Sequence, residues 1–167
     1  SAFQLAGNAL LAAQAQGQIA HILRLQGKVN EALYILQDEV LPVFERLGDS
    51  YSKAVTMGRI ADILQSRGQM DEALRIRQEE ELPIFERLGD VREKAVTMSK
   101  IADALQSQGQ MDEALRIRQE EQLPVFEHLG DLHSKAATMG QIADILQSRG
   151  QLDEALTIWQ TECLPVF

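Results

Sequence analysis

The apolar positions of this chain recur at helical spacing. In residues 48–88 a first set lies at steps of three and four residues, which places it on one face of a helix: Ala54, Met57, Ile60, Ala61 and Leu64. A second apolar set follows after a glycine: Ala73, Leu74, Leu82, Ile84, Phe85 and Leu88. Sustained alternation of apolar and polar residues, which is typical of strands, does not occur. The pattern therefore predicts two helices in this stretch and no strand.

Capping residues give the bounds of these two helices. Asp49 is a good N-cap, because its carboxylate accepts hydrogen bonds from the free N–H groups of the first turn. Gly68 suits the left-handed position that ends a helix. The second helix is expected to begin near Met70, followed by Asp71 in the first turn, and to end at Gly89. Each stretch is thus a helical hairpin with short loops.

The same hairpin pattern returns every 41 residues, opened by Gly7, Gly48, Gly89 and Gly130. Residues 48–88 and 89–129 are identical at 31 of 41 positions. A period between about 20 and 50 residues marks an array of stacked supersecondary units. We expect one all-α repeat domain over residues 1–167, a solenoid of four helix–turn–helix repeats with about eight antiparallel helices. Its units, called copies one to four below, are 7–47, 48–88, 89–129 and 130–167.

Each copy carries a proline within its second predicted helix, at Pro42, Pro83, Pro124 and Pro165. An interior proline removes one backbone hydrogen bond and clashes with the carbonyl four residues back, at a cost of about 3 kcal/mol. For Pro83 that carbonyl belongs to Glu79. The sequence leaves two outcomes open, a kinked helix or a helix broken into two.

The segment from Gly68 to Leu74 resembles the tetratricopeptide repeat (TPR) family. Aligning its glycine with that of the family places Ile60, Ala61, Leu64 and Ala73 on family positions. The other copies match through Ala20, Ala32, Ala102, Ala114, Ala143 and Ala155. The period of 41 in place of 34 is a departure, as in the longer variant of the repeat. The resemblance implies a right-handed α–α superhelix that holds peptides or partner proteins, with helix one of each copy lining the inner surface.

A polar stripe runs along helix one, opposite its apolar face, and the resemblance would turn it toward this inner surface. The candidate binding residues are His21, Arg24, Arg59, Asp62, Gln65, Lys100, Asp103, Gln106, Gln141, Asp144 and Gln147. Stacking would align Asp62, Asp103 and Asp144, and Arg59 and Lys100 lie three residues before their aspartates, within reach of a surface ion pair. The stripe is either a solvated face or a groove that favours an extended polar or basic segment.

Helix two has polar residues at the centre of its apolar side, Arg77 with Glu81 and Arg118 with Gln122. The equivalent residues are Leu36 with Val40 in copy one and Trp159 with Cys163 in copy four. Two interpretations remain open. Either a phase shift at the proline lets these side chains snorkel to solvent, or they form a polar seam between neighbouring copies that fixes their register.

Composition excludes several classes of function. A net charge of −9 without clustered Lys and Arg argues against nucleic acid and against an anionic membrane. Cys163 is the single cysteine and is expected to be a small buried hydrophobe. His128 and His133 lack further ligands at metal spacing, and no catalytic motif is present. We expect a cytoplasmic protein that is not an enzyme and uses no cofactor or metal.

The leading functional hypothesis is a non-catalytic scaffold or sensor module that binds an unidentified protein or peptide. The alternative is a structural spacer or a self-associating stack without a foreign ligand. Phe3 and Phe167 are four periods apart, and the chain ends without a polar capping helix. The sequence thus suggests a piece of a longer array, with Ser1 and Ala2 left by cloning, and end-to-end self-association is a further expectation.

Overall fold

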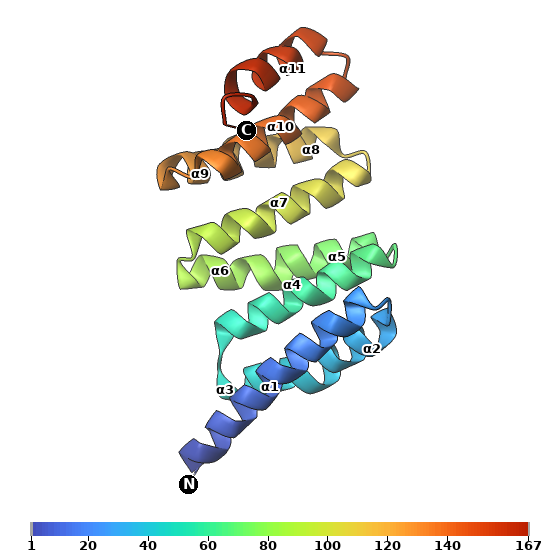
Figure 1. Cartoon of the computed structure of the whole chain (residues 1–167), viewed down its shortest axis with the longest axis vertical. Coiled ribbons are helices and arrows are strands. Elements are labelled where there is room, and N and C mark those ends of the chain that lie inside the picture. The colour runs from blue at the N-terminus through green and yellow to red at the C-terminus, as the bar shows by residue number, and fades with distance from the viewer. Residues whose placement is uncertain (1, 167) are drawn as a thin grey trace. The chain divides into compact units, whose positions relative to one another are not determined.

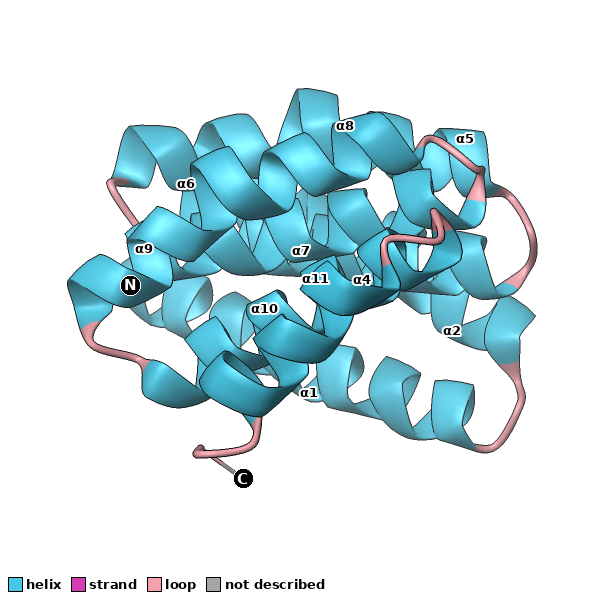
Figure 2. Cartoon of the chain, turned by 90° about the horizontal axis from the view of Figure 1, so that it is seen from above, coloured by secondary structure: helices cyan, strands magenta, loops and turns pink. Residues whose placement is uncertain are grey.

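The structure is a computed structural model that describes residues 2–166, with side chains from Gln4 onward. Within these residues every regular element is helical and none is a strand (Figures 1 and 2). The predicted all-α fold is therefore confirmed. The side chain of Phe3 and residue Phe167, the two ends of the predicted four periods, lie outside the described part, as do Ser1 and the side chain of Ala2.

Each copy contributes two antiparallel helices in the described part of the chain. Helix one is α1 (Ala2–Leu25), α4 (Ser50–Ser66), α7 (Val91–Ser107) or α10 (Leu132–Ser148). Helix two has three parts in copies one to three: α2 (Val29–Tyr34), η1 (Ile35–Val40) and α3 (Leu41–Leu47); α5 (Met70–Arg75), η2 (Ile76–Glu81) and α6 (Leu82–Leu88); α8 (Met111–Arg116), η3 (Ile117–Gln122) and α9 (Leu123–Leu129). Copy four has α11 (Leu152–Ile158) and η4 (Trp159–Cys163). The chain divides after Gly89 into two compact units of two copies each.

The predicted caps hold the helix ends. Asp49, Asp90 and Asp131 each accept a hydrogen bond of 3.0 Å from the backbone N–H three residues later. Gly68 follows α4 with φ of 77°, a left-handed conformation that a residue with a side chain adopts only with strain. Short polar side chains and glycines thus end the helices at the positions that the sequence predicted.

Helix two passes its proline through a π-helical turn. The Leu82 N–H, next to Pro83, donates to the Arg77 carbonyl five residues back, and Leu41 and Leu123 repeat this bond in their copies. Proline has no backbone N–H, and the π turn does not need one at this position. The wider turn also relieves the clash of the proline ring with the carbonyl four residues back. The helix is therefore not broken in copies one to three, and of the two outcomes considered the break is wrong.

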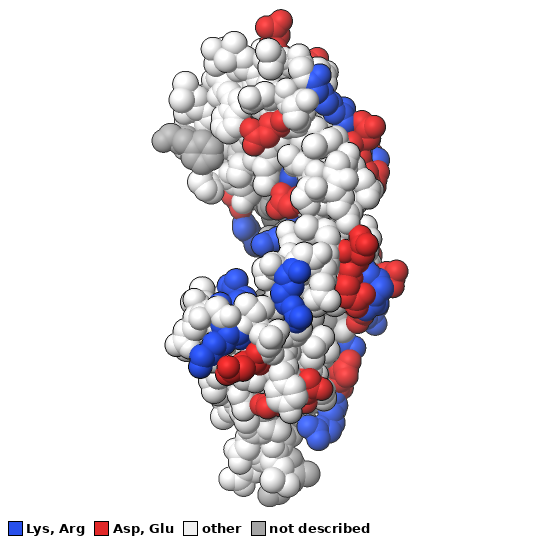
Figure 3. Space-filling view, turned by 90° about the vertical axis from the view of Figure 1, so that its right-hand side faces the viewer, with Lys and Arg blue, Asp and Glu red and all other residues white. Residues whose placement is uncertain are grey.

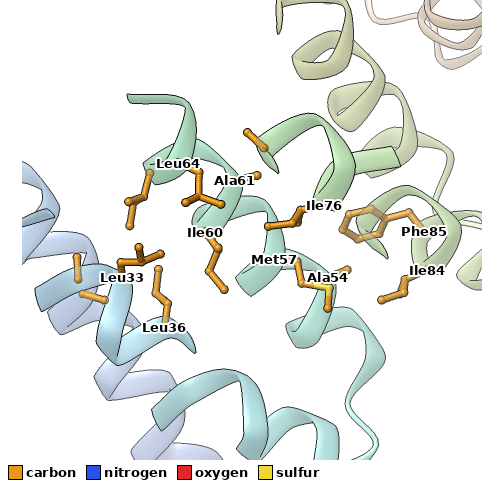
Figure 4. Packing of buried hydrophobic residues seen from close by; sticks show 14 residues of the cluster. Leu33, Leu36, Ala54, Met57, Ile60, Ala61, Leu64, Ile76, Ile84 and Phe85 are labelled. Atoms are coloured by element: carbon orange, nitrogen blue, oxygen red, sulfur yellow. The ribbon is translucent and has the colours of Figure 1, made fainter. Parts of the chain in front are cut away.

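Apolar side chains from consecutive copies share a buried cluster in the first unit (Figure 4). Leu33 and Leu36 of copy one share a buried cluster with Ile60, Leu64 and Phe85 of copy two. In the second unit Leu115 of copy three packs against a cluster of copy four, formed by Ile142, Ala143, Leu146 and Ala155. Adjacent copies therefore bury surfaces that one hairpin alone leaves exposed, as expected of a repeat array.

Candidate functional site

Four predicted binding residues of the first unit line one pocket between α1 and α4. His21 and Arg24 come from copy one, and Arg59 and Asp62 from copy two. Ala20, Leu36 and Ile63 complete the lining of this pocket, whose volume is about 240 Å³. A smaller pocket of about 120 Å³ shares Arg59 and has walls that include Val40, Phe44 and Tyr51. The first unit thus offers a polar pocket beside a more apolar one.

The second unit repeats this arrangement between α7 and α10. Its pocket of about 470 Å³ is lined by Asp103 and Gln106 of copy three and by Gln141 and Asp144 of copy four. Ser107, Met111 and Arg118 complete the lining. Each unit therefore brings helix-one residues of two copies together. Gln65, Lys100 and Gln147, also predicted, line neither pocket and lie partly or fully exposed.

A buried arginine lies beneath the pocket of the second unit. Arg118 of η3 is 0% exposed and donates from Nη2 to Asp103 Oδ1 at 2.6 Å and to Gln106 Oε1 at 3.2 Å. Its Nη1 donates to Gln141 Oε1 at 2.5 Å. The prediction that these side chains snorkel to solvent is therefore wrong. Arg118 contacts helix one of its own copy and of the next, as a polar seam requires.

Arg77 takes the equivalent position in the first unit. This side chain is buried, donates to Asp62, and pairs with the buried Glu81 at 3.1 Å. Two of the three aspartates of the predicted ladder thus receive a guanidinium from helix two. Arg59, expected beside Asp62, has its Nη1 3.5 Å from the Gly17 carbonyl of copy one, a long hydrogen bond.

Copy four lacks this arginine. Trp159 stands at the equivalent position and packs so closely on Gly140 that a Cβ atom there would lie 3.0 Å from the ring. Asp144, one turn beyond Gly140, is exposed; its backbone carbonyl accepts a hydrogen bond from Ser148 Oγ, and its carboxylate has no hydrogen bond or ion pair with another residue that the structure describes. The pocket of the second unit therefore contains one carboxylate paired with an arginine, Asp103, and one unpaired, Asp144.

The sequence placed Arg118 in a polar seam as one of two open interpretations and did not predict that Arg118 also lines the pocket. The signal was present in the spacing: Arg77 and Arg118 each lie fifteen residues after the aspartate to which they bind. Recognising that spacing as a contact requires knowing how helix two packs on helix one of the same copy, which the structure supplies. The arginine thus joins helix one to helix two within a copy.

Cys163 is fully buried, and its Sγ lies 3.4 Å from the Ala136 carbonyl. Burial raises the pKa of this thiol, and the negative charges of Glu162 and Asp144 raise it further. The interpretation of Cys163 as a small buried hydrophobe is confirmed.

Charges of both signs alternate on the face of the molecule shown in Figure 3. Neither unit presents there a broad surface of one sign. No helix within residues 2–166 is long and apolar enough to cross a membrane.

No family model matches the sequence, and no curated protein matches it. Solved structures do resemble it. One is a crystal structure of nearly identical TPR-like repeats of a kinesin light chain from Podosopora anserina, with a TM-score of 0.70 and 23% identity over 89% of this chain and 72% of the other. A variant of that protein gives a TM-score of 0.71 and 22% identity over 89% of this chain and 71% of the other.

BtubC from P. vanneervenii gives a TM-score of 0.76 at 17% identity and matches 87% of this chain. The present chain spans 59% of that structure. These likenesses agree with the hairpins, caps and stacked cores found in each unit. The chain therefore has the fold of TPR-like helical repeat proteins.

Proposed function

We propose that the chain is a non-catalytic interaction module whose helix-one surface binds an extended segment of another protein. The fold supports a protein-interaction scaffold in general terms, and the two pockets supply the specific surface. Both lie between helix one of adjacent copies, and both combine charged groups with amide or apolar side chains. Each unit thus offers one such pocket to a bound segment.

The observation that carries the proposal is the unpaired carboxylate of Asp144. Its equivalents Asp62 and Asp103 accept hydrogen bonds from Arg77 and Arg118, whereas Trp159 replaces the arginine in copy four. A bound lysine or arginine would supply the missing positive charge. We therefore propose a partner segment with a basic residue opposite Asp144 and amide or hydroxyl groups near Gln106 and Gln141.

The expected energy of this contact is modest. An ion pair at an exposed site contributes about 0.2–1 kcal/mol, because water and salt screen it. Asp144 would thus contribute more to the specificity for a basic residue than to the affinity for the whole segment. Most of the affinity for the second unit would come from side chains that enter its pocket and from apolar contact with Met111.

A random-peptide display selection tests the proposal with the protein as it stands. Wild-type protein should enrich peptides with a lysine or arginine, and Asp144→Lys should weaken their binding about five-fold or more. Glu120→Lys is the matched control, because it makes the same charge change on helix two away from the pocket and should bind as wild type does. Enrichment of acidic peptides, or equal binding by both variants, would overturn the proposal.

Asp62 and Asp103 are poor targets for this test. Each accepts a hydrogen bond from a buried arginine, so a lysine there would remove a carboxylate from that arginine and place a second positive charge beside it. Loss of binding would then report damage to the fold. Asp144, exposed and unpaired, is free of this problem.

We place this activity in the cytoplasm. The single buried thiol is compatible with a reducing compartment, and the proposal requires no disulfide and no cofactor.

A further inference from the structure

We propose that the first unit binds a small apolar carboxylic acid, with its apolar group in the pocket of about 120 Å³ between α1 and α4 and its carboxylate at Arg59. This pocket is called the Gly17 pocket below, and its walls include Gly17, Val40, Phe44, Val55 and Arg59. The inference goes beyond the proposed function and is independent of segment binding in the second unit.

In copies two and four a side chain of helix two packs against a glycine of helix one. A Cβ atom added at Gly58 would lie 2.6 Å from Glu81 Oε1. A Cβ atom added at Gly140 would lie 3.0 Å from the Trp159 ring. Two unrelated side chains thus fill the space beside the same glycine position of the repeat.

Gly17, the equivalent glycine of copy one, has no such neighbour. Helix two of copy one carries Leu36 and Val40 at the positions of Arg77 and Glu81. Neither side chain comes within 4 Å of a Cβ atom built on Gly17, and among the described residues only Arg59 Nη1 does so, at 3.3 Å. The space that a carboxylate or an indole ring fills in other copies is therefore left open in copy one.

The walls of the Gly17 pocket suit an apolar group. Val40 and Phe44 are buried, and Ala13 of α1 and Val55 of α4 add further apolar surface. An engineered cavity of about 150 Å³ lined by aliphatic and aromatic side chains binds benzene. A pocket of about 120 Å³ therefore admits one ring or a branched aliphatic group of similar size.

Arg59 sets the charge of the ligand. It is half-buried, and Asp62, three residues later, binds Arg77 instead. Among the described residues its only hydrogen bond runs from Nη1 to the Gly17 carbonyl and is long, at 3.5 Å. A partly buried cation without a counter-charge favours an anion, and a guanidinium can donate two parallel hydrogen bonds to a carboxylate. Arg24, which lines the adjoining pocket with Arg59, adds a second positive charge.

The second unit has different residues at both positions. Ser99 stands in place of Gly17, and Gln141 stands in place of Arg59. The Gln141 side-chain oxygen accepts a hydrogen bond from Arg118 at 2.5 Å. An apolar acid should therefore bind to the first unit and not to the second.

Amide chemical-shift titration of the whole chain tests the proposal with four probes. Phenylacetate has both the ring and the carboxylate, phenylacetamide keeps the ring without the charge, acetate keeps the charge without the ring, and phenethylammonium reverses the charge. Phenylacetate should give saturable shifts at Gly17, Val55 and Thr56, which line the pocket. The other three probes should bind about five-fold or more weakly.

Two variants, each with a matched control, assign the site. Arg59→Gln should weaken phenylacetate binding about five-fold, to the level of phenylacetamide, whereas Arg67→Gln makes the same charge change at the end of α4, outside the pocket, and should bind as wild type does. Gly17→Val places a side chain in the pocket and should abolish binding of both ring compounds. Gly7→Val is its control, because a Cβ atom there has no neighbour within 4 Å. Circular dichroism checks that each variant folds.

Absence of saturable phenylacetate binding by the wild type would overturn the proposal. Equal affinities for phenylacetate and phenylacetamide, or unchanged binding by a folded Gly17→Val, would also overturn it. None of these results bears on peptide binding at Asp144, which belongs to the second unit, and failure of the peptide selection would leave this titration unaffected.

Discussion

The Arg77 guanidinium and the Glu81 carboxylate form a buried ion pair, with Nη1 and Oε2 3.1 Å apart, on the π segment of helix two. Copy one has Leu36 and Val40 at these positions and buries them equally well. The same structural position therefore accepts either an apolar pair or an ion pair. Asp62, on helix one, gives Arg77 a second acceptor.

Breaking this pair on one side should destabilise the chain. We expect Glu81→Val alone to lower the free energy of unfolding by about 3 kcal/mol, because Arg77 stays buried with only Asp62 beside it. The double variant Arg77→Leu with Glu81→Val, which installs the residues of copy one, should be within about 1 kcal/mol of wild type or more stable. Urea unfolding followed by circular dichroism measures both.

Glu79→Val is the control for this series. Its carboxylate is exposed and 3.6 Å from Arg75, so its loss should change stability by about 0.5 kcal/mol at most. If the double variant proved as unstable as Glu81→Val, the ion pair would be required as such, and the equivalence with copy one would be refuted.

Gly58 leaves the space that the Glu81 carboxylate fills. A Cβ atom at residue 58 would lie 2.6 Å from Glu81 Oε1, and Glu81 cannot withdraw without leaving Arg77. We expect Gly58→Ala to cost about 1–2 kcal/mol net, since the clash outweighs a gain of about 1 kcal/mol in helix propensity. Gly7→Ala, at a helical glycine with no neighbour within 4 Å, should instead be neutral or stabilising. Thermal unfolding of both variants compares them, and equal melting temperatures would contradict the packing described.

Asp131, the N-cap of α10, should make the free energy of unfolding depend on pH. Hydrogen bonds from the backbone and side chain of Ser134, and then the charge of Arg92, lower the pKa of Asp131. A carboxyl whose pKa is lower in the folded state contributes stability above its unfolded pKa, near 4, and this contribution is lost as pH falls through the folded value. We expect Asp131→Asn to be less stable than wild type at neutral pH and equal to it well below pH 4. A difference that does not change with pH in urea unfolding would exclude this linkage.

The Cys163 thiol should be protected from modification in the folded chain. It is fully buried, and burial raises its pKa, so little thiolate is present at neutral pH. Labelling with a disulfide reagent should be slow under native conditions and accelerate through the urea unfolding transition. Rapid labelling of the native protein would show that helix two of copy four opens locally.

Much of the fold follows from the sequence because its determinants are local. Asp49, Gly68 and the spacing of Ile60 and Leu64 need only helix geometry and capping to be interpreted. The π turn before Pro83 does not, because an interior proline is compatible with a kink or a break, and local helix geometry alone does not decide between them. An ideal helix already places Arg77 at the centre of the apolar side, and what the sequence left open was whether its side chain stays there or reaches solvent.

The candidate site was predictable in part for the same reason. His21, Arg24, Arg59 and Asp62 were identified by their shared helix-one stripe, and they do line one pocket. Which aspartates are neutralised depends on arginines that approach from helix two. The distinction between Asp103 and Asp144 therefore appeared only with the three-dimensional structure.

The most direct test of the interaction surface is amide chemical-shift mapping with a peptide selected as above. The account predicts that the largest shifts fall at Asp103, Gln106, Gln141 and Asp144, and that at a sub-saturating peptide concentration they are smaller in Asp144→Lys but not in Glu120→Lys. Shifts centred instead on the outer surface of helix two, around Arg116 and Glu120, would contradict it.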